Sequence, residues 1–453
     1  MAPPSLEVPV VSLPGFQIPL PLERPELATR AMARFACTRS ACPDSCCRYF
    51  GIHFDKPSMS RMLTATAHHA SDHERIVRLV VLGMPLPQAG KTQVVLDENG
   101  SCPMLEKSGD CELQRRYGES LLPTVCSVFP RTSLALPDRV EVTGTLACPE
   151  LARLTLLSDD GVQQEESVAS LMPRSYIGKS VPACGDVSDH YAAPFLQVRS
   201  SLCDLFRRDT FPLSSRLVFA AHLAAQVDDF FHRDSDAFRG AKRQFARQRL
   251  TTELAAAMSD TSQEELHREL CAFAAPAEVV VSAVLGLVTE RLRLPHPSRF
   301  ADLVTSVLAS LGANGEVSTR EDGIAASQIA ARVLHRQELE TELRFPGLTD
   351  QILSRYGQHY LLRNPYTDAP SLLHYLGRLA LALATIRLLI IGSAKTRRPV
   401  DAKSYAEMAV DVIQVFTKAV SHQADFLTAI HRASEIGSGT TFGRLVLFAK
   451  FHG

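Results

Sequence analysis

The most constraining feature of this sequence is the uneven distribution of its cysteines. Eight of the eleven cysteines lie between Cys37 and Cys148, in a chain of 453 residues. In a reducing compartment such a group of cysteines indicates metal or redox chemistry, whereas in a secreted chain it indicates disulfide bonds. The compartment therefore decides what kind of fold the cysteine-rich region can adopt.

The N-terminal residues show no export signal. They lack a basic segment followed by an uninterrupted apolar run, and the seven prolines in residues 1–25 predict an extended arm. We therefore expect a cytoplasmic protein, in which clustered cysteines bind a metal ion or an iron–sulfur cluster.

Charge and hydropathy exclude two classes of partner. The net charge is only -1, with 48 basic and 49 acidic residues, so a broad basic field for nucleic acid is absent. The best membrane candidate, residues 375–392, is interrupted by Arg378 and Arg387. Two arginines within the hydrocarbon core are unfavourable, so this segment is predicted to be a buried core helix. We expect no nucleic-acid partner and no membrane partner.

The cysteine spacing predicts a metal centre. Four thiolates suit either a tetrahedral zinc ion or a [4Fe–4S] cluster, and eight can form two sites or one site with four supporting thiols. The paired Cys-x2-Cys spacing of many zinc sites is absent, and both metals remain open. Arginines crowd the region, Arg131 among them, and could offset the negative charge of a four-thiolate cluster. The predicted metal ligands are Cys37, Cys42, Cys46, Cys47, Cys102, Cys111, Cys126 and Cys148.

The chain divides into three regions. Residues 1–29 form the proline-rich arm, residues 30–155 the cysteine-rich domain and residues 156–453 a helical domain. Strand-like pieces at residues 51–54, 92–96 and 140–143 alternate with turn signals in the second region. The fold class is mainly α, with a small cysteine-rich α+β metal-binding unit packed on a larger all-α body. Apolar spacing of three and four residues predicts helices at 195–206, 217–231, 245–258, 264–273, 277–294, 300–311, 323–334, 350–362, 372–391, 402–420, 424–430 and 442–451.

Two arginines stand on the most apolar predicted helix. Buried arginines usually need a carboxylate partner or an anionic ligand. Arg378 and Arg387 are therefore candidates for lining a ligand pocket, and together with Arg131 they form the predicted cofactor-binding set.

These motifs resemble a known family. The run Arg34-Phe35-x-Cys37-x4-Cys42-x-Asp44-x-Cys46-Cys47 is similar to the opening of flagellin lysine-N-methylases, as is the stretch from Cys102 to Arg131. The cysteine portion also resembles a wider bacterial family described as zinc- or iron-chelating. Farther on, Tyr360-Leu361-Leu362-x-Asn364 and Val412-Ile413-Gln414-x5-Val420 resemble the family's helical half. Phe50 stands where the family commonly has tryptophan, and Phe416-Thr417-Lys418 replaces a more typical aromatic-Ser-Arg.

The resemblance implies a protein lysine N-methyltransferase. Its donor would be S-adenosylmethionine, its cysteine domain would hold a [4Fe–4S] cluster, and its substrate would be a protein such as flagellin. The alternative is a non-catalytic iron–sulfur or zinc-binding protein with a redox or partner-binding role, favoured because no familiar donor-binding motif is recognisable. The sequence predicts neither a catalytic base nor an oligomeric state.

Overall fold

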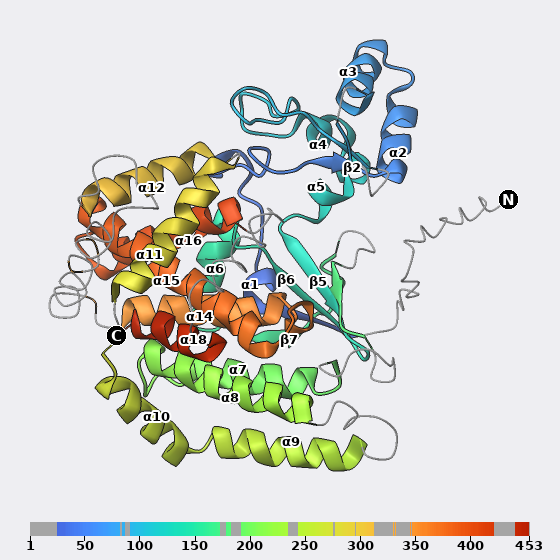
Figure 1. The fold of residues 1–453 in the computed structure, drawn as a ribbon. Coiled ribbons are helices and arrows are strands. Elements are labelled where there is room, and N and C mark those ends of the chain that lie inside the picture. Colours follow the sequence, from blue (N-terminus) through green and yellow to red (C-terminus); the bar gives the residue numbers. More distant parts are fainter. Residues whose placement is uncertain are drawn as a thin grey trace.

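The structure is a computed structural model that describes residues 25–81, 84–86, 91–172, 178–182, 192–233, 243–274, 277–294, 296–311, 329, 331, 345, 347–420 and 440–452. Within these residues a small lobe of short strands and helices stands beside a large body of helices (Figure 1). Only the last five residues of the predicted proline-rich arm lie in the described part of the chain. The mainly helical fold class is confirmed.

A mixed sheet packs against the helical body. In the described chain its five strands have the order β7-β1-β6-β5-β8. β1 pairs in parallel with β6 and antiparallel with β7, while β5 pairs antiparallel with β6 and in parallel with β8. The strands are β1 Glu26–Thr29, β5 Arg131–Ala135, β6 Val140–Gly144, β7 Gln164–Glu166 and β8 Lys179–Ser180.

This sheet reaches beyond the predicted cysteine-rich region at both ends. β1 belongs to residues that we predicted as the arm, and β7 and β8 belong to residues that we assigned to the helical domain. Strands of two to four residues are too short to show a clear alternation of apolar and polar side chains. Their pairing with distant strands, and not a local pattern, defines them.

A second, smaller sheet lies in the cysteine-rich lobe. Its order is β2-β4-β3, formed by His53–Phe54, Lys91–Gln93 and Met84–Leu86, so the predicted strands at 51–54 and 92–96 are present in shorter form. The Asp55 carboxylate accepts a hydrogen bond of 2.8 Å from the Ser58 N–H and thereby starts α2. The helices of this lobe are α2 Lys56–Thr66, α3 Ala70–Val81, α4 Glu112–Tyr117 and α5 Thr124–Val128.

The helices of the body agree with those predicted from the apolar spacing. Ten described helices overlie predicted ones, whereas the predicted helices at 323–334 and 424–430 lie outside the described residues, apart from 329 and 331. Two helices close to the sheet are α1 Arg30–Ala33 and α6 Pro149–Leu157. The helices of the body are α7 Phe195–Arg207, α8 Leu213–Arg233, α9 Arg243–Ala257, α10 Asp260–Ala272, α11 Ala277–Arg293, α12 Ser298–Ser310, α14 Leu348–Arg363, α15 Leu372–Arg397, α16 Ala402–Val420 and α18 Thr441–Lys450.

Helix α15 is the central helix of the body. It packs against α8, α12, α16 and α18. Its length and composition would allow it to cross a membrane, yet 89% of its most apolar window is buried inside the protein. The prediction of a core helix is confirmed. Asp228 caps its N-terminus by accepting hydrogen bonds of 2.9 Å from the N–H groups of Leu372 and Leu373.

A buried ion pair joins the sheet to the body. Glu141 on β6 is fully buried and accepts two hydrogen bonds, of 2.6 and 2.7 Å, from the Arg199 guanidinium on α7. Arg139 approaches the same carboxylate at 2.9 Å. Burial alone would raise the pKa of Glu141, but the two arginines lower it overall. The carboxylate is therefore charged at neutral pH and holds β6 against α7.

Replacing Glu141 by Gln leaves Arg199 buried without a counter-charge, and we expect the free energy of unfolding to fall by about 3–5 kcal/mol. Urea unfolding measures the change. Because folding lowers the pKa of Glu141, its contribution is present above the unfolded-state pKa and is lost as the pH falls through the folded value. The difference between wild type and Glu141→Gln should shrink below about pH 4. Glu150→Gln, which loses only a pair with the half-exposed Arg153, is the control and should cost less than about 1 kcal/mol.

Candidate metal centre

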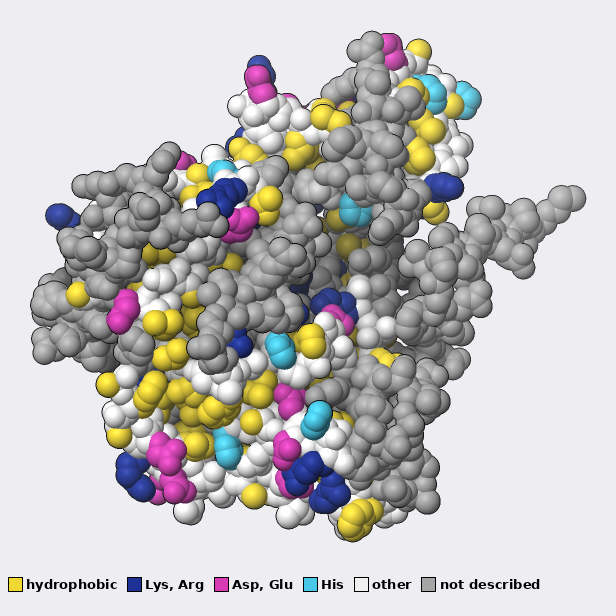
Figure 2. Space-filling model, in the orientation of Figure 1, with side chains coloured by type: hydrophobic (Ala, Val, Ile, Leu, Met, Phe, Trp, Pro, Cys, Tyr) yellow, Lys and Arg dark blue, Asp and Glu magenta, His cyan; other side chains and the backbone are white. Residues whose placement is uncertain are grey.

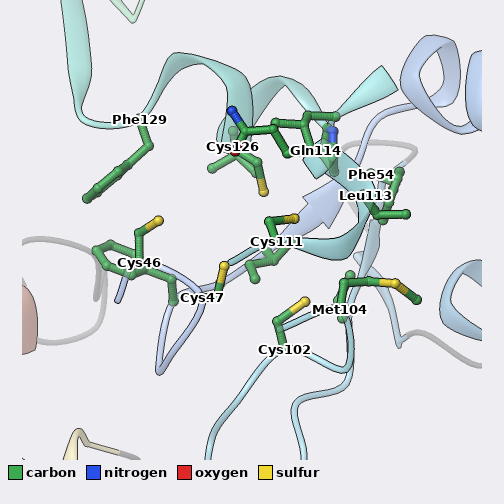
Figure 3. Close-up of a pocket in the computed structure, with 17 residues that line it drawn as sticks. Cys46, Cys47, Phe54, Cys102, Met104, Cys111, Leu113, Gln114, Cys126 and Phe129 are labelled. Carbon is green, nitrogen blue, oxygen red and sulfur yellow. The ribbon is translucent and has the colours of Figure 1, made fainter. Parts of the chain in front are cut away.

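Five of the eight predicted ligands surround one cavity. Cys46 and Cys47 come from the loop before β2, Cys102 from the turn after β4, Cys111 from the start of α4 and Cys126 from α5. The cavity measures about 90 Å³, which is room for several atoms. In Figure 3 the sulfur atoms of four of these residues face one another, and Cys46 lies at the edge of the group.

Backbone hydrogen bonds bring these separate segments together. The Cys102 N–H donates to the Cys47 carbonyl at 2.8 Å, and the Tyr49 N–H donates to the Gly100 carbonyl at 2.8 Å. Gly100 has φ 69°, and a Cβ atom there would lie 2.2 Å from the Tyr49 ring. Only glycine fits this turn without strain. The Gly100 N–H closes the same turn by donating to the Asp97 carbonyl at 2.9 Å.

The walls of the cavity are apolar, and this changes the acidity of the thiols. Burial raises the pKa of Cys102 to about 11. Contact with Cys111 lowers the pKa of Cys47, but contact with Cys46 and burial outweigh it and raise that pKa to about 12. Contact with Cys47, together with burial, raises the pKa of Cys111 well above its usual range. Thiols in such a site become thiolates when a metal cation balances their charge.

The other three predicted ligands do not line this cavity. Cys148 is buried at the start of α6, where backbone N–H groups of that helix contact its sulfur, and burial raises its pKa to about 12. Cys37 and Cys42 lie near enough for their charges to act on Cys148. Cys42 lines a second cavity of about 170 Å³, which it shares with Asp44. The structure thus divides the eight cysteines into five and three, a grouping that their spacing left open.

The donor set consists of soft thiols, which suit either a zinc ion or an iron–sulfur cluster. Cys47, Cys102, Cys111 and Cys126 supply one sulfur from each of four segments around one cavity. The Cys47 thiol contacts those of Cys46 and Cys111. In the part of the chain that the structure describes, no three His, Cys, Asp or Glu side chains are arranged to hold a single metal ion.

Asp44 connects this site to the helical body. Its carboxylate accepts a hydrogen bond of 2.5 Å from the Lys418 ammonium and one of 2.9 Å from the Gln414 amide, both on α16. Arg299 on α12 approaches the same carboxylate at 3.2 Å. The Lys418 side chain is only 1% exposed, and its nitrogen lies 5.4 Å from the ring centre of Phe50, which lines the five-cysteine cavity. One buried charge network therefore positions the loop that carries Cys46 and Cys47.

The three predicted cofactor arginines have different environments. Arg387 donates to the Asp350 carboxylate at 2.8 Å, so its charge is already balanced within the protein. The Arg131 guanidinium lies 5.6 Å from the Phe35 ring, and its Nε has no hydrogen-bond partner among the described residues. The same holds for Nε of Arg378. None of the three lines either of the two cavities described above.

An unpartnered Nε is not special to Arg131 and Arg378, because within the described residues the Nε atoms of Arg216, Arg363 and Arg387 are also buried without a partner. Sequence reasoning missed the role of Asp44 as the anchor of the cysteine loop, since only the fold shows that Lys418 faces it.

We expect Lys418→Met to lower the free energy of unfolding by about 3–5 kcal/mol, because it leaves the Asp44 carboxylate buried without its main counter-charge. Lys418→Arg keeps the charge and should stay within about 1.5 kcal/mol of wild type. Lys403→Met removes a lysine that is 83% exposed and serves as the control, with an expected change below about 0.5 kcal/mol. Urea unfolding of the three variants measures these values. Equal stability of Lys418→Met and wild type would contradict the anchoring role.

Comparison with known proteins places the helical body in a family. Residues 199–447 match the FliB lysine N-methylase C-terminal domain. Lysine-N-methylases from Salmonella typhimurium and Salmonella choleraesuis are each 29% identical over 154 residues, which is 31% of this chain and 37% of each relative. The flagellar biosynthetic protein FliU of Salmonella muenchen is 27% identical over 132 residues, or 29% of this chain and 76% of that protein.

The match spans little more than a third of the length of the two lysine-N-methylases. No solved structure matches the chain. The matched domain nevertheless covers more than half of the sequence, from the buried Arg199 of α7 to α18, and includes the helix that anchors the cysteine loop. By this match the chain belongs to the FliB lysine N-methylase C-terminal domain family.

Proposed function

We propose that this protein is a lysine N-methyltransferase that modifies protein side chains, with S-adenosylmethionine as methyl donor and a [4Fe–4S] cluster in the five-cysteine cavity. The observation that carries the proposal is the Asp44–Lys418 contact. It joins the loop of Cys46 and Cys47 to α16, a helix inside the residues that match the lysine N-methylase domain. The five-cysteine cavity and the family's helical body are therefore parts of one structure.

Four cysteines are the proposed cluster ligands. Cys47, Cys102, Cys111 and Cys126 offer one thiol from each of four segments, and Cys46 lies beside them as a spare donor. Soft thiolate donors suit an iron–sulfur cluster. When bound, such a cluster supplies electron transfer or, at an iron with an open position, a Lewis-acid binding point. Phe54, Met104, Leu113 and other apolar residues line the site.

The protein must also prepare a lysine side chain for reaction. A lysine ammonium has no free electron pair, so it must lose its proton before its nitrogen attacks the methyl group of the donor. Cationic or apolar surroundings lower the pKa of a lysine and favour the neutral amine. Arginines on the helices that match the family domain provide cationic surroundings, because their guanidinium groups remain charged at every physiological pH.

The relatives suggest the substrate class. Two are named lysine-N-methylases and one is named a flagellar biosynthetic protein. We therefore propose a protein substrate, with flagellin as the first to test. This substrate, like the activity itself, rests on relatives that the chain matches over only part of their length.

The cluster proposal predicts a defined loss of iron. Protein purified without oxygen should contain about four iron atoms and four labile sulfides per cluster. Cys111→Ser and Cys102→Ser should each lose most of this iron, because each removes a ligand from the cavity. Cys203→Ser changes a buried thiol in the helical core and is the matched control, which should keep its iron. Stoichiometric zinc without sulfide would contradict the cluster and favour a zinc-binding protein.

The activity proposal predicts labelled lysines. Cluster-loaded protein incubated with methyl-labelled S-adenosylmethionine and purified flagellin should transfer label to lysine side chains, which peptide mass spectrometry locates. The Cys111→Ser protein should transfer at least about 100-fold less if the centre takes part in the reaction. Loaded protein that labels neither flagellin nor any other protein of the source cell would favour the non-catalytic metal-binding role.

A further inference from the structure

A second cavity lies where the cysteine-rich lobe meets the helical body. It measures about 170 Å³, which is room for several non-hydrogen atoms. The lobe contributes residues from the segment 39–49 and from the turn at 105–109, and the body contributes residues 297–299 at the start of α12. We call it the arginine cavity, because Arg39, Arg48 and Arg299 all line it.

Two of these arginines have no acidic partner. Within the described residues the guanidinium groups of Arg39 and Arg48 make no ion pair and no hydrogen bond. Glu106, on the turn that lines the cavity, is held instead by Arg115, with contacts of 2.5 and 2.9 Å. The charges of Arg39 and Arg48 are therefore available to a ligand.

The acid in the wall does not compensate them. Asp44 is the one acidic residue among the described residues that line the cavity, and the Lys418 ammonium already donates to its carboxylate at 2.5 Å. Arg299 approaches Asp44 at 3.2 Å and pairs with Asp411 at 2.5 Å, but Arg397 shares that second carboxylate at 2.7 Å. The cations around the cavity thus outnumber the acids.

The shape of the site makes this excess of positive charge significant. A single exposed arginine without an acid is ordinary, because water solvates its charge. Here three guanidinium groups line one concave site, in which like charges repel one another and focus a positive potential. An anion placed between them would relieve the repulsion, so the charge pattern favours an anionic ligand.

The backbone holds the arginines in place by an uncommon conformation. Arg39 has φ 50° and Tyr49 has φ 58°, the left-handed region that residues other than glycine seldom adopt. Both residues line the arginine cavity. Such conformations cost free energy and are concentrated at ligand-binding sites. The Tyr49 N–H donates to the Gly100 carbonyl at 2.8 Å, and this bond fixes the turn beside Arg48.

The lining of the cavity suits a carboxylate on a short apolar stem. Guanidinium groups bind carboxylates through two parallel hydrogen bonds. Pro43, Leu105 and Pro297 also line the cavity and offer an apolar surface to the methylene groups of such a ligand. An inorganic anion would leave that surface without a contact. The side chain of an aspartate or a glutamate fits both parts of the lining.

The arginine cavity and the five-cysteine cavity share one loop. Residues 42–45, 48 and 49 line the arginine cavity, and residues 46, 47, 50 and 51 line the five-cysteine cavity. The two cavities are therefore separated by one layer of backbone. An extended peptide advances about 3.3 Å per residue, so a few residues are enough to reach from one cavity to the other.

We propose that the arginine cavity binds an acidic side chain of the protein substrate, a few residues from the lysine that is methylated. Arg39 and Arg48 bind the carboxylate, and Arg299 forms the opposite wall. The site thereby selects lysines that have an acidic neighbour. This inference rests on the proposed function, which supplies a protein substrate with a reactive lysine.

The test uses full-length, cluster-loaded protein and fluorescent lysine peptides. The peptides come in pairs that differ only by Glu or Gln at one position, and this position is moved along both sides of the lysine. Fluorescence anisotropy should show that at least one Glu peptide binds about 10-fold more tightly than its Gln counterpart, because charge-assisted hydrogen bonds are gained. Arg39→Gln and Arg48→Gln should each reduce this preference to about 2-fold or less.

The matched control is Arg233→Gln. It removes an exposed arginine of α8 that pairs with Asp229 at 2.7 Å, at the opposite end of the molecule from the cysteine-rich lobe (Figure 1). This variant should keep the full preference of wild type. Circular dichroism and iron content show whether each variant keeps its fold and its five-cysteine cavity. If a Gln variant loses either, Arg39→Lys and Arg48→Lys replace it and should show a several-fold smaller preference, because lysine lacks the two-pronged geometry.

Two results would overturn the inference directly. One is equal binding of the Glu and Gln peptides at every position, and the other is a preference that survives in both arginine variants. The α-carboxylate of S-adenosylmethionine is another source of the same ligand chemistry, and the decarboxylated donor tests it. An arginine-dependent preference between the two donors, with none between the peptides, would assign the cavity to the donor and overturn the substrate assignment.

The outcomes also separate this inference from the proposed function. Methyl transfer to flagellin by wild type, without any preference between the peptides, would overturn the inference and leave the function standing. A peptide preference that depends on Arg39 and Arg48, without methyl transfer to any protein, would support the site and overturn the function.

Discussion

The Asp44 carboxylate is the contact on which the arrangement of this protein depends. Asp44 lies between Cys42 and Cys46 in the sequence. Its carboxylate is held by Lys418, Gln414 and Arg299, which come from two helices of the body. The same Gln414 also donates to the Ala147 carbonyl at 2.9 Å, next to Cys148. Because these charges are buried, their geometry is strongly constrained, and α16 therefore positions both the loop that carries Cys46 and Cys47 and the segment that carries Cys148.

This anchoring explains how a loop-rich lobe can offer an ordered set of ligands. The lobe has short helices and strands of two or three residues, and its own apolar core is small. Such a lobe gains little stability from burial alone. Hydrogen bonds between the turn at Gly100 and the loop at Cys47, together with the contacts to α16, stabilise the conformation of the lobe. A bound cluster would add further stability, since metal binding is coupled to folding in small cysteine-rich units.

The body uses buried charge to hold its elements together. Glu141 with Arg199, and Asp350 with Arg387, are balanced pairs that join helices and strands. A sequence pattern does not predict these pairs, because it shows that an arginine lies on an apolar helix but not which carboxylate faces it.

The amino-acid sequence by itself determined the helices of the body, since three- and four-residue apolar spacing is a local signal. It also determined that eight cysteines are concentrated in the N-terminal third, and that the most apolar segment, with Arg378 and Arg387, is a core helix. Only the tertiary structure decided that five cysteines share one cavity while Cys148 joins a different group, that β1 extends the sheet, and that Asp44 meets Lys418. These are contacts between residues far apart in the chain, and no local periodicity encodes such a pairing.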